Sequence, residues 1–179
     1  YNGLTYDSEA VLFNDDQWHL VEAYFKLNTL DSAAGKPVAD GILRGWFDGK
    51  LVVEKTDVVF RTTDYPKMEW NQFLLTPYFG PGLLPHAQTL WIDDLAVATR
   101  RIDTGGEGPL PEGDTGIAAR YPGDAGIEKD PAVVFADGFE DCAKPADLNK
   151  KWDHVYHDAD MRIAEEAVNL HGGKRALEC

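Results

Sequence analysis

The chain has 179 residues, of which 44% are hydrophobic and 27% are charged. These values are typical of globular proteins and argue against a disordered chain, a collagen-like repeat or a coiled coil. Its 31 acidic residues outnumber its 17 basic residues, so the formal net charge is −14. This charge disfavours binding to nucleic acid or to an anionic membrane surface. No apolar run reaches the roughly 18 residues that a membrane span needs.

The first part of the sequence predicts β-strands. Apolar residues alternate through residues 20–27, so that Val21, Ala23 and Phe25 share one side of a strand. The next strand, at 42–47, ends at Asp48-Gly49, a strong hairpin signal, and its partner follows at 50–54. Further β-rich segments are 58–61, 71–75 and 89–98. Regularly spaced strands with turn residues between them predict a β-sandwich.

Glycine and proline are concentrated between residues 103 and 130. An unstructured stretch of this length joins separately packed parts, so we interpret it as a linker or strap. β-rich segments return at 132–135, 152–156, 161–163 and 174–177, and we expect loop and strand rather than helix over 163–170. The predicted organisation is a main part of the sandwich at 1–102, the strap at 103–130 and a tail at 131–179.

The sequence contains few motifs of known chemistry. Its two cysteines, Cys142 and Cys179, form no C-x-x-C pair, which argues against a zinc site or a redox motif. A disulfide and two reduced thiols both stay open. Phosphate-cradling loops and nucleophile elbows are absent, which excludes kinase, dehydrogenase and serine-hydrolase interpretations.

Several motifs of the first part resemble one family. In chain order they are W-x-x-V-E at 18–22, K-x-N-T at 26–29, D-G-x-x-x-x-W-x-D-G at 40–49, N-Q-F at 71–73 and W-I-D-D-L at 91–95. Together, over residues 10–102, they resemble the C-terminal half of the concanavalin A-like jelly rolls of alginate and glucuronan lyases. The segments 134–141, 152–153 and 172–177 look like the opening strands of the same domain. The resemblance implies an extracellular, all-β jelly-roll sandwich whose halves stand in reversed order.

The reversed order raises the question of what completes the sandwich. A half-sandwich would leave an apolar face and unpaired strand edges in water. The tail could fold back on its own chain as a circular permutation, or the chain could be a piece cut out of phase from tandem domains. Alternatively, the tail completes the sheet of a neighbouring copy, and this head-to-tail contact propagates into a filament. The family's middle strands have no clear counterpart, which weakens an enzymatic interpretation.

The resemblance also implies a glycan-binding face. Strand alternation places Glu22, Tyr24 and Lys26 in one row, and the family's sheet order would align this row with Arg44 and Trp46. Aromatic rings beside hydrogen-bonding charges suit sugar rings with their hydroxyls and carboxylates. We therefore expect a polysaccharide or surface glycan to bind Glu22, Tyr24, Lys26, Arg44, Trp46 and Gln72. The alternative is a solvated sheet face with a simple charge pattern.

A polysaccharide lyase that cleaves uronate polymers by β-elimination is the competing interpretation. Such an enzyme neutralises the uronate carboxylate, removes the adjacent proton with a base and protonates the leaving oxygen with an acid. The candidates are Arg44 or Gln72 as neutraliser, Lys26 or His86 as base, and Tyr24 or Tyr78 as acid. No spacing fixes this assignment, so the catalytic residues stay unassigned.

A structural calcium ion is the cofactor that the resemblance implies. In many carbohydrate-binding jelly rolls, a Phe-Glu pair near the first strand and an Asp-Asp pair of the last strand meet around calcium. Phe139-Glu140 and Asp93-Asp94 stand in the matching positions, and oxygen ligands suit this ion. We expect Asp93, Asp94 and Glu140 to bind it and to tie the tail to the first part. The alternative is that these residues are ordinary surface acids.

Overall fold

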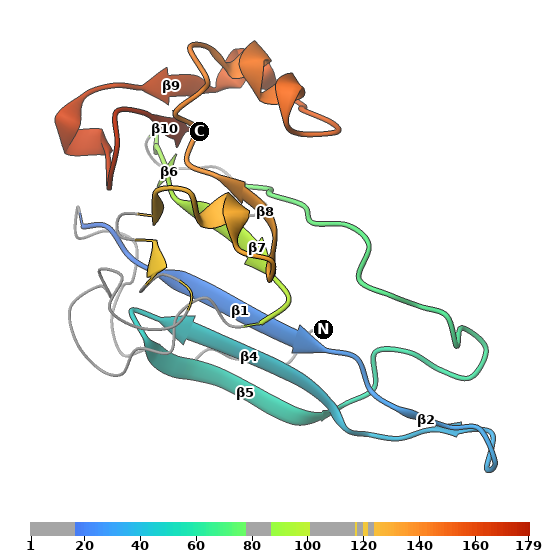
Figure 1. Ribbon diagram of the computed structural model, residues 1–179. Coiled ribbons are helices and arrows are strands. Elements are labelled where there is room, and N and C mark those ends of the chain that lie inside the picture. The colour runs from blue at the N-terminus through green and yellow to red at the C-terminus, as the bar shows by residue number, and fades with distance from the viewer. Residues whose placement is uncertain (1–16, 78–86, 101–116, 118–119, 122–123) are drawn as a thin grey trace. The chain divides into compact units, whose positions relative to one another are not determined.

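The computed structural model describes residues 17–77, 87–100, 117, 120–121 and 124–179 (Figure 1). The chain forms two compact units. Unit 1 comprises Tyr1–Phe73 and Asp103–Pro111, and unit 2 comprises Leu74–Ile102 and Glu112–Cys179. The structure therefore groups residues 74–102 with the tail, whereas the sequence grouped them with the first strands. The described elements are mostly strands in antiparallel sheets with short 3₁₀ helices, so the prediction of an all-β fold is confirmed.

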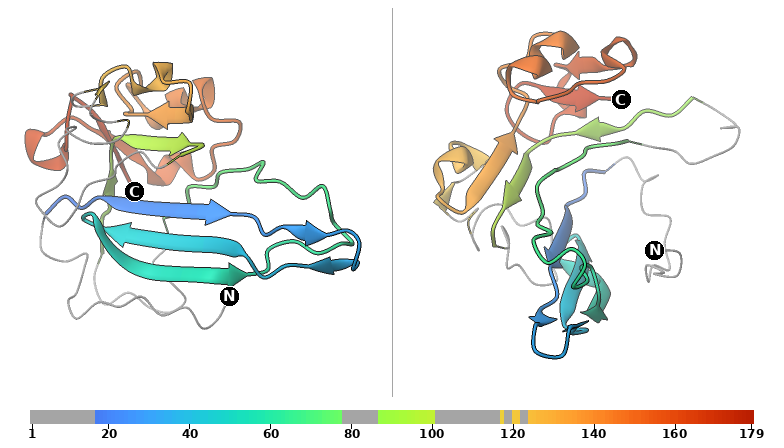
Figure 2. Two further views of the ribbon diagram at one scale, coloured as in Figure 1. Left: turned by 60° about the horizontal axis from the view of Figure 1, so that its bottom comes forward. Right: turned by 90° about the vertical axis from the view of Figure 1, so that its right-hand side faces the viewer.

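Unit 1 is built on one three-stranded antiparallel sheet (Figure 2). Its strands are β1 (Val21–Lys26), β4 (Gly41–Phe47) and β5 (Lys50–Val58), in the order β1-β4-β5. A small hairpin of β2 (Leu30–Asp31) and β3 (Lys36–Pro37) lies between β1 and β4 in the chain. At the turn between β4 and β5, Asp48 and Gly49 both have positive φ, of 49° and 77°. Two consecutive positive φ angles are what a tight hairpin turn requires, so the predicted hairpin is confirmed.

Buried hydrogen bonds explain the K-x-N-T motif. The Asn28 side chain is fully buried, and its Oδ1 accepts the backbone N–H groups of Phe60 (2.9 Å) and Arg61 (2.8 Å). Its Nδ2 donates to the carbonyls of Thr29 (3.0 Å) and Arg61 (3.1 Å). The backbone N–H and the hydroxyl of Thr29 both donate to Asp40, at 2.6 and 2.8 Å. These residues therefore fix the chain after β1 to the start of β4 and to the segment that follows β5.

The apolar side of β1 is more exposed than its alternation predicts. Val21 is 61% exposed and Phe25 is 47% exposed, whereas Glu22 and Tyr24 on the other side are half-buried. Phe25 packs against the ring of Trp70, with 5.6 Å between the ring centroids. Part of the apolar surface of the strand is therefore covered by aromatic side chains rather than by another sheet layer within this unit's described residues.

Unit 2 contains two small antiparallel sheets. The first has the order β6-β10-β9, and the second pairs β7 with β8. The strands are β6 (Trp91–Ile92), β7 (Leu95–Ala98), β8 (Val133–Asp137), β9 (Arg162–Ala164) and β10 (Ala176–Glu178). Among the described residues, the 3₁₀ helices between them include η3 (Ile127–Lys129), η4 (Pro145–Lys150), η5 (Asp158–Asp160) and η6 (Ala167–Asn169).

Strands of the tail pair with the segment around the Asp93-Asp94 motif. Leu95 to Ala98 in β7 pair with β8, and Trp91 and Ile92 in β6 pair with β10. Asp94, between β6 and β7, has a φ of 50°, so the chain turns there and the single strand expected at 89–98 becomes two. Both pairings form within one chain.

Of the segments expected as strands, 58–61 contributes only Val58, the last residue of β5, and two others form no strand among the described residues. Residues 71–75 and 152–156 have no strand pairing. In the second segment, the Trp152 indole N–H donates to the buried carboxylate of Asp137 at 2.7 Å, and its ring packs on Phe135 at 4.8 Å. These side-chain contacts hold the segment against β8. Its apolar residues therefore pack there without a ladder of backbone hydrogen bonds. In the first segment, Phe73 and Leu74 are exposed, at 45% and 64%.

The core of unit 2 consists of two clusters. The larger one contains Phe139, Cys142, Leu148, Ile163 and Leu177, all contributed by the tail. The smaller one contains Ile117, Ile127 and Ala136. Ile117 and Ile127 belong to the segment interpreted as a linker or strap, so the described part of that segment contributes to a core.

Both cysteines are free thiols in the structure. Cys142 is buried in the larger cluster and Cys179 is half-buried against it. Burial raises the pKa of both thiols above the ordinary value, which favours the neutral form and makes them poor nucleophiles. Between residues 17 and 179, the segments that the structure describes include no helix long and apolar enough to cross a membrane.

Candidate functional site

The expected glycan-binding row lies on one face of the unit 1 sheet. The register of β1 against β4 pairs Glu22 with Trp46, Tyr24 with Arg44 and Lys26 with Ile42. Directly paired residues of antiparallel strands project from the same side, and alternate residues of a strand share a side. The structure therefore brings Glu22, Tyr24, Arg44 and Trp46 together as two adjacent cross-strand pairs.

Arg44 is held in place on this face by the third strand. It pairs with Glu54 of β5, and its Nε donates to Glu54 Oε1 at 2.7 Å. Both side chains are partly exposed, at 37% and 44%, so this ion pair contributes little to stability and serves to orient the guanidinium. Among the described residues, the structure gives the two terminal nitrogens of Arg44 no partner. They can donate to a carboxylate or to hydroxyls of a ligand.

The other two members of the expected set are less well placed. Lys26 ends β1 and is exposed. Gln72 lies in the irregular segment after β5, is exposed, and has no hydrogen bond to the row among the described residues. Tyr78 and His86, which are candidates for a lyase acid and base, lie outside the described residues. Of the expected residues, the structure thus places Glu22, Tyr24, Arg44 and Trp46 next to one another on one face of the sheet.

The expected calcium ligands all face the segment 171–175 of unit 2. Asp93 Oδ2 accepts the backbone N–H groups of His171 (3.2 Å) and Gly172 (3.4 Å). Asp94 Oδ2 lies 2.8 Å from His171 Nδ1. Glu140 Oε1 accepts the backbone N–H groups of Lys174 (2.7 Å) and Arg175 (3.0 Å). The three carboxylates therefore meet one short segment of the tail.

Burial and mutual repulsion govern the protonation of this acidic region. Burial, reinforced by the charge of Asp94, raises the pKa of Asp93 to about 6. The same two causes raise the pKa of Asp124 to about 6. The hydrogen bond to Asp94 is the main cause that raises the pKa of His171 above its ordinary value. Asp93 and Asp124 therefore take up a proton at a higher pH than ordinary aspartates, and His171 keeps its proton to a higher pH than an ordinary imidazole.

The donor set does not fit a calcium ion. Calcium takes six to eight oxygen ligands at about 2.3 to 2.6 Å. Within the described ranges, no three His, Cys, Asp or Glu side chains are grouped so that they could hold a metal ion. The carboxylates instead face N–H groups and an imidazole ring. The structure thus supports a role for Asp93, Asp94 and Glu140 in holding the tail, and calcium itself stays a prediction.

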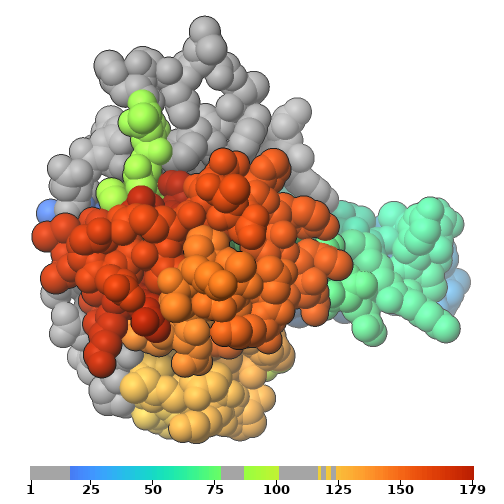
Figure 3. Space-filling view, turned by 90° about the horizontal axis from the view of Figure 1, so that it is seen from above, coloured from blue at the N-terminus to red at the C-terminus, as the bar shows by residue number. Residues whose placement is uncertain are grey.

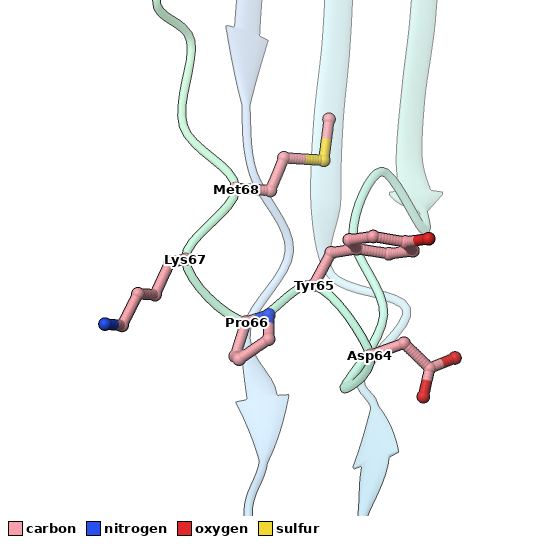
Figure 4. A pocket seen from close by; sticks show the side chains of 5 residues that line it. All are labelled: Asp64, Tyr65, Pro66, Lys67 and Met68. Carbon is pink, nitrogen blue, oxygen red and sulfur yellow. The ribbon is translucent and has the colours of Figure 1, made fainter.

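A shallow hollow of about 530 Å³ lies on unit 1, lined by five consecutive residues, Asp64 to Met68 (Figure 4). Tyr65 and Met68 project to one side of the segment and Lys67 projects to the other. Tyr65 is 72% exposed. The described lining residues all come from one surface turn, so among them no polar groups from different elements converge, as they do in a built ligand site.

Sequence reasoning missed two histidine contacts. His171 contacts Asp94, and His19 Nδ1 lies 2.8 Å from Asp48 Oδ2 while its ring packs on Phe47 at 4.7 Å. Asp48 also accepts the backbone N–H of Leu20 at 2.9 Å. The D-G turn signal identifies Asp48 as a turn residue, but the second role of its carboxylate depends on the long-range fold.

Comparison with protein-family models, with curated proteins and with solved structures finds no match for this chain.

Proposed function

We propose that the chain is an extracellular module with a concanavalin A-like jelly-roll sandwich, and that it binds a polysaccharide on the β1–β4 face of unit 1. The observation that carries this proposal is the register, which pairs Tyr24 with Arg44 and Glu22 with Trp46 on one side of the sheet. Aromatic rings stack on the apolar faces of pyranose rings, and the oriented guanidinium of Arg44 recognises a carboxylate or a pair of hydroxyls. The motifs of the first part support the jelly-roll assignment.

The local charges of the face bear on the choice of glycan. The chain as a whole carries a net charge of −14, which repels polyanions. Arg44 and Lys26 are the cations that offset this repulsion near the row. A uronate polymer would therefore bind with a strong dependence on salt, whereas a neutral glycan would bind with little.

The test compares binding by matched variants of the full chain. Affinity electrophoresis in gels that contain alginate, glucuronan or a neutral β-glucan measures the affinity directly. We expect Arg44→Ala and Tyr24→Ala to weaken binding about tenfold, which corresponds to about 1.4 kcal/mol. Lys55→Ala is the control, because Lys55 pairs with Leu43 and so lies on the opposite side of the sheet. Unretarded migration in all three gels, or equal weakening by Lys55→Ala, would contradict the proposal.

The same mixtures test the lyase interpretation. β-Elimination creates an unsaturated uronate that absorbs in the near ultraviolet, whereas a binding module produces no new chromophore. We expect constant absorbance with alginate and glucuronan. A steady rise would assign the chain to the lyases instead, with Tyr78 and His86 as the first residues to replace.

A second candidate function is structural self-assembly by tail exchange. It is favoured by the pairing of β8 with β7 and of β10 with β6, which attaches the tail to the segment 91–98. An identical element exchanged between copies would form the same pairs between chains, and the contact would propagate head to tail. We propose that copies of the chain assemble head to tail through this exchange.

Cysteine cross-linking separates closed from exchanged tails. Ala96 and Ala136 are direct cross-strand partners. A mixture of the single variants Ala96→Cys and Ala136→Cys, refolded together and oxidised, gives a cross-linked dimer only if tails are exchanged. The double variant in one chain is the positive control, and the unmodified chain measures background from Cys142 and Cys179. Light scattering then shows whether the assembly grows beyond the 19.9 kDa monomer; a monomer without a mixed cross-link contradicts exchange.

A further inference from the structure

Hydrogen bonds connect three acidic residues of unit 2 to one short segment of the tail. On the one side are Asp93 and Asp94, between β6 and β7, and Glu140, which follows β8. On the other side is the segment 171–175, which precedes β10. Figure 3 shows the surface of unit 2 to which the C-terminal segment, coloured orange to red, contributes.

The tail presents hydrogen-bond donors to these carboxylates. The backbone N–H groups of His171 and Gly172 donate to Asp93 Oδ2, and the imidazole of His171 contacts Asp94 Oδ2 at 2.8 Å. The other oxygen of Asp93 accepts the N–H of Asp94 at 2.9 Å. Both oxygens of Asp93 are thus already occupied by donors from the chain itself.

Glu140 is bound in the same way at the next residues of the tail. Its Oε1 accepts the N–H groups of Lys174 and Arg175 at 2.7 and 3.0 Å. The Arg175 guanidinium donates to the Glu140 carbonyl at 2.6 Å and to Glu165 Oε1 at 3.0 Å. Side chain and backbone of Glu140 therefore contact the same segment of the tail.

One glycine allows this close approach. A Cβ on Gly173, whose φ is +61°, would lie 2.0 Å from Glu140 Oε1. At Gly172 and Gly138 a Cβ would make ordinary van der Waals contact with Asp94, at 3.5 and 3.6 Å. The backbone at Gly173 therefore lies directly against the Glu140 carboxylate.

Oriented backbone N–H groups form a concavity that binds anions, and here the anions are the chain's own carboxylates. We propose that Asp93, Asp94 and Glu140 hold the segment 171–175 directly, as a clasp that docks the tail without a bound cation. Four backbone amides and the His171 imidazole supply the positive end of the interaction, which the resemblance assigned to calcium. The clasp acts whether the tail belongs to the same chain or to a neighbouring copy, so it does not rest on the function proposed above.

The first arm of the test is calcium itself. Isothermal titration of the full chain with calcium chloride should give no binding heat, and the thermal midpoint should be the same in calcium and in chelator. The proposal would be overturned if calcium binds the unmodified chain and raises its thermal midpoint, and if it does neither in the Asp94→Asn variant. Calcium that binds equally to the Asp94→Asn variant occupies another site. In that case the clasp is supported if calcium does not change the hydrogen exchange of the tail, which the second arm measures.

The second arm measures docking of the tail by hydrogen exchange of the amides of residues 171–178. Glu140→Gln and Gly173→Ala should speed this exchange at least about tenfold, and calcium should not restore protection. Gly126→Ala is the matched control, because it has a φ of +80° but only the flexible Lys129 side chain near its Cβ. Glu140→Gln keeps the test valid if Gly173→Ala does not fold. Unchanged exchange in Glu140→Gln would overturn the clasp.

Discussion

Replacement of Asn28 by alanine tests the assignment of the K-x-N-T motif to the fold. The side chain is fully buried and makes four hydrogen bonds, all to backbone groups of Thr29, Phe60 and Arg61. In Asn28→Ala the N–H groups of Phe60 and Arg61 lose their acceptor. A buried donor without a partner costs about 1 to 2 kcal/mol, so the two together should lower the free energy of unfolding of unit 1 by about 3 kcal/mol.

Urea unfolding followed by tryptophan fluorescence measures this loss, since Trp70 packs against Phe60 at 5.3 Å and reports on the same region. Asn71→Ala is the control, because Asn71 is exposed and should change stability by less than about 0.5 kcal/mol. Fluorescence should be compared with circular dichroism, because two units can unfold separately. A loss below about 1 kcal/mol in Asn28→Ala would refute the reasoning, since it would mean that water replaces the amide at little cost.

Two further predictions concern unit 2. Trp152→Phe removes the donor to the buried carboxylate of Asp137 and should cost about 2 kcal/mol in urea unfolding; a loss within error would show that Asp137 does not need the indole. Because the folded pKa values of Asp93 and Asp124 are raised to about 6, stability should fall as pH rises from about 4 to 6, by roughly 1 kcal/mol for each carboxyl after allowance for solvent screening. The raised pKa of His171 acts in the same direction, since its contribution is complete below its ordinary pKa and is lost as pH rises through the folded value. Equal or higher stability at pH 8 than at pH 5 would contradict both arguments, and Asp124→Asn should flatten the slope.

Local signals in the sequence were sufficient for the hairpin of unit 1. The alternation of residues 20–27 and the Asp48-Gly49 turn depend on neighbours in the chain, and the structure has β1, β4 and β5 where these signals predict strands. The pairing of Tyr24 with Arg44 does not follow from this alternation, because a shift of the register by two residues would also keep the apolar side together.

Long-range contacts account for the expectations that were wrong. Residues 152–156 have the composition of a strand, but Trp152 finds its partner in Asp137, fifteen positions away. The strap is rich in glycine and proline, yet Ile117 and Ile127 are buried against β8 residue Ala136. Composition cannot reveal such contacts, because one isoleucine in a polar segment gives no periodic signal.

Two groups of residues have separate physical roles. The motif residues that carry the resemblance maintain the fold, and the other group is proposed to bind glycan. Asn28, Asp40 and Asp48 satisfy backbone N–H groups within unit 1, so their replacement damages the fold before it can report on a ligand. Tyr24 and Arg44 project from the sheet, and the Arg44 contact is a partly exposed ion pair with Glu54. Replacement of Arg44 should therefore leave the unfolding midpoint within the range of ordinary surface variants, whereas replacement of the half-buried Tyr24 also removes packing. A loss of glycan affinity in Arg44→Ala then measures recognition alone, which a motif variant cannot do.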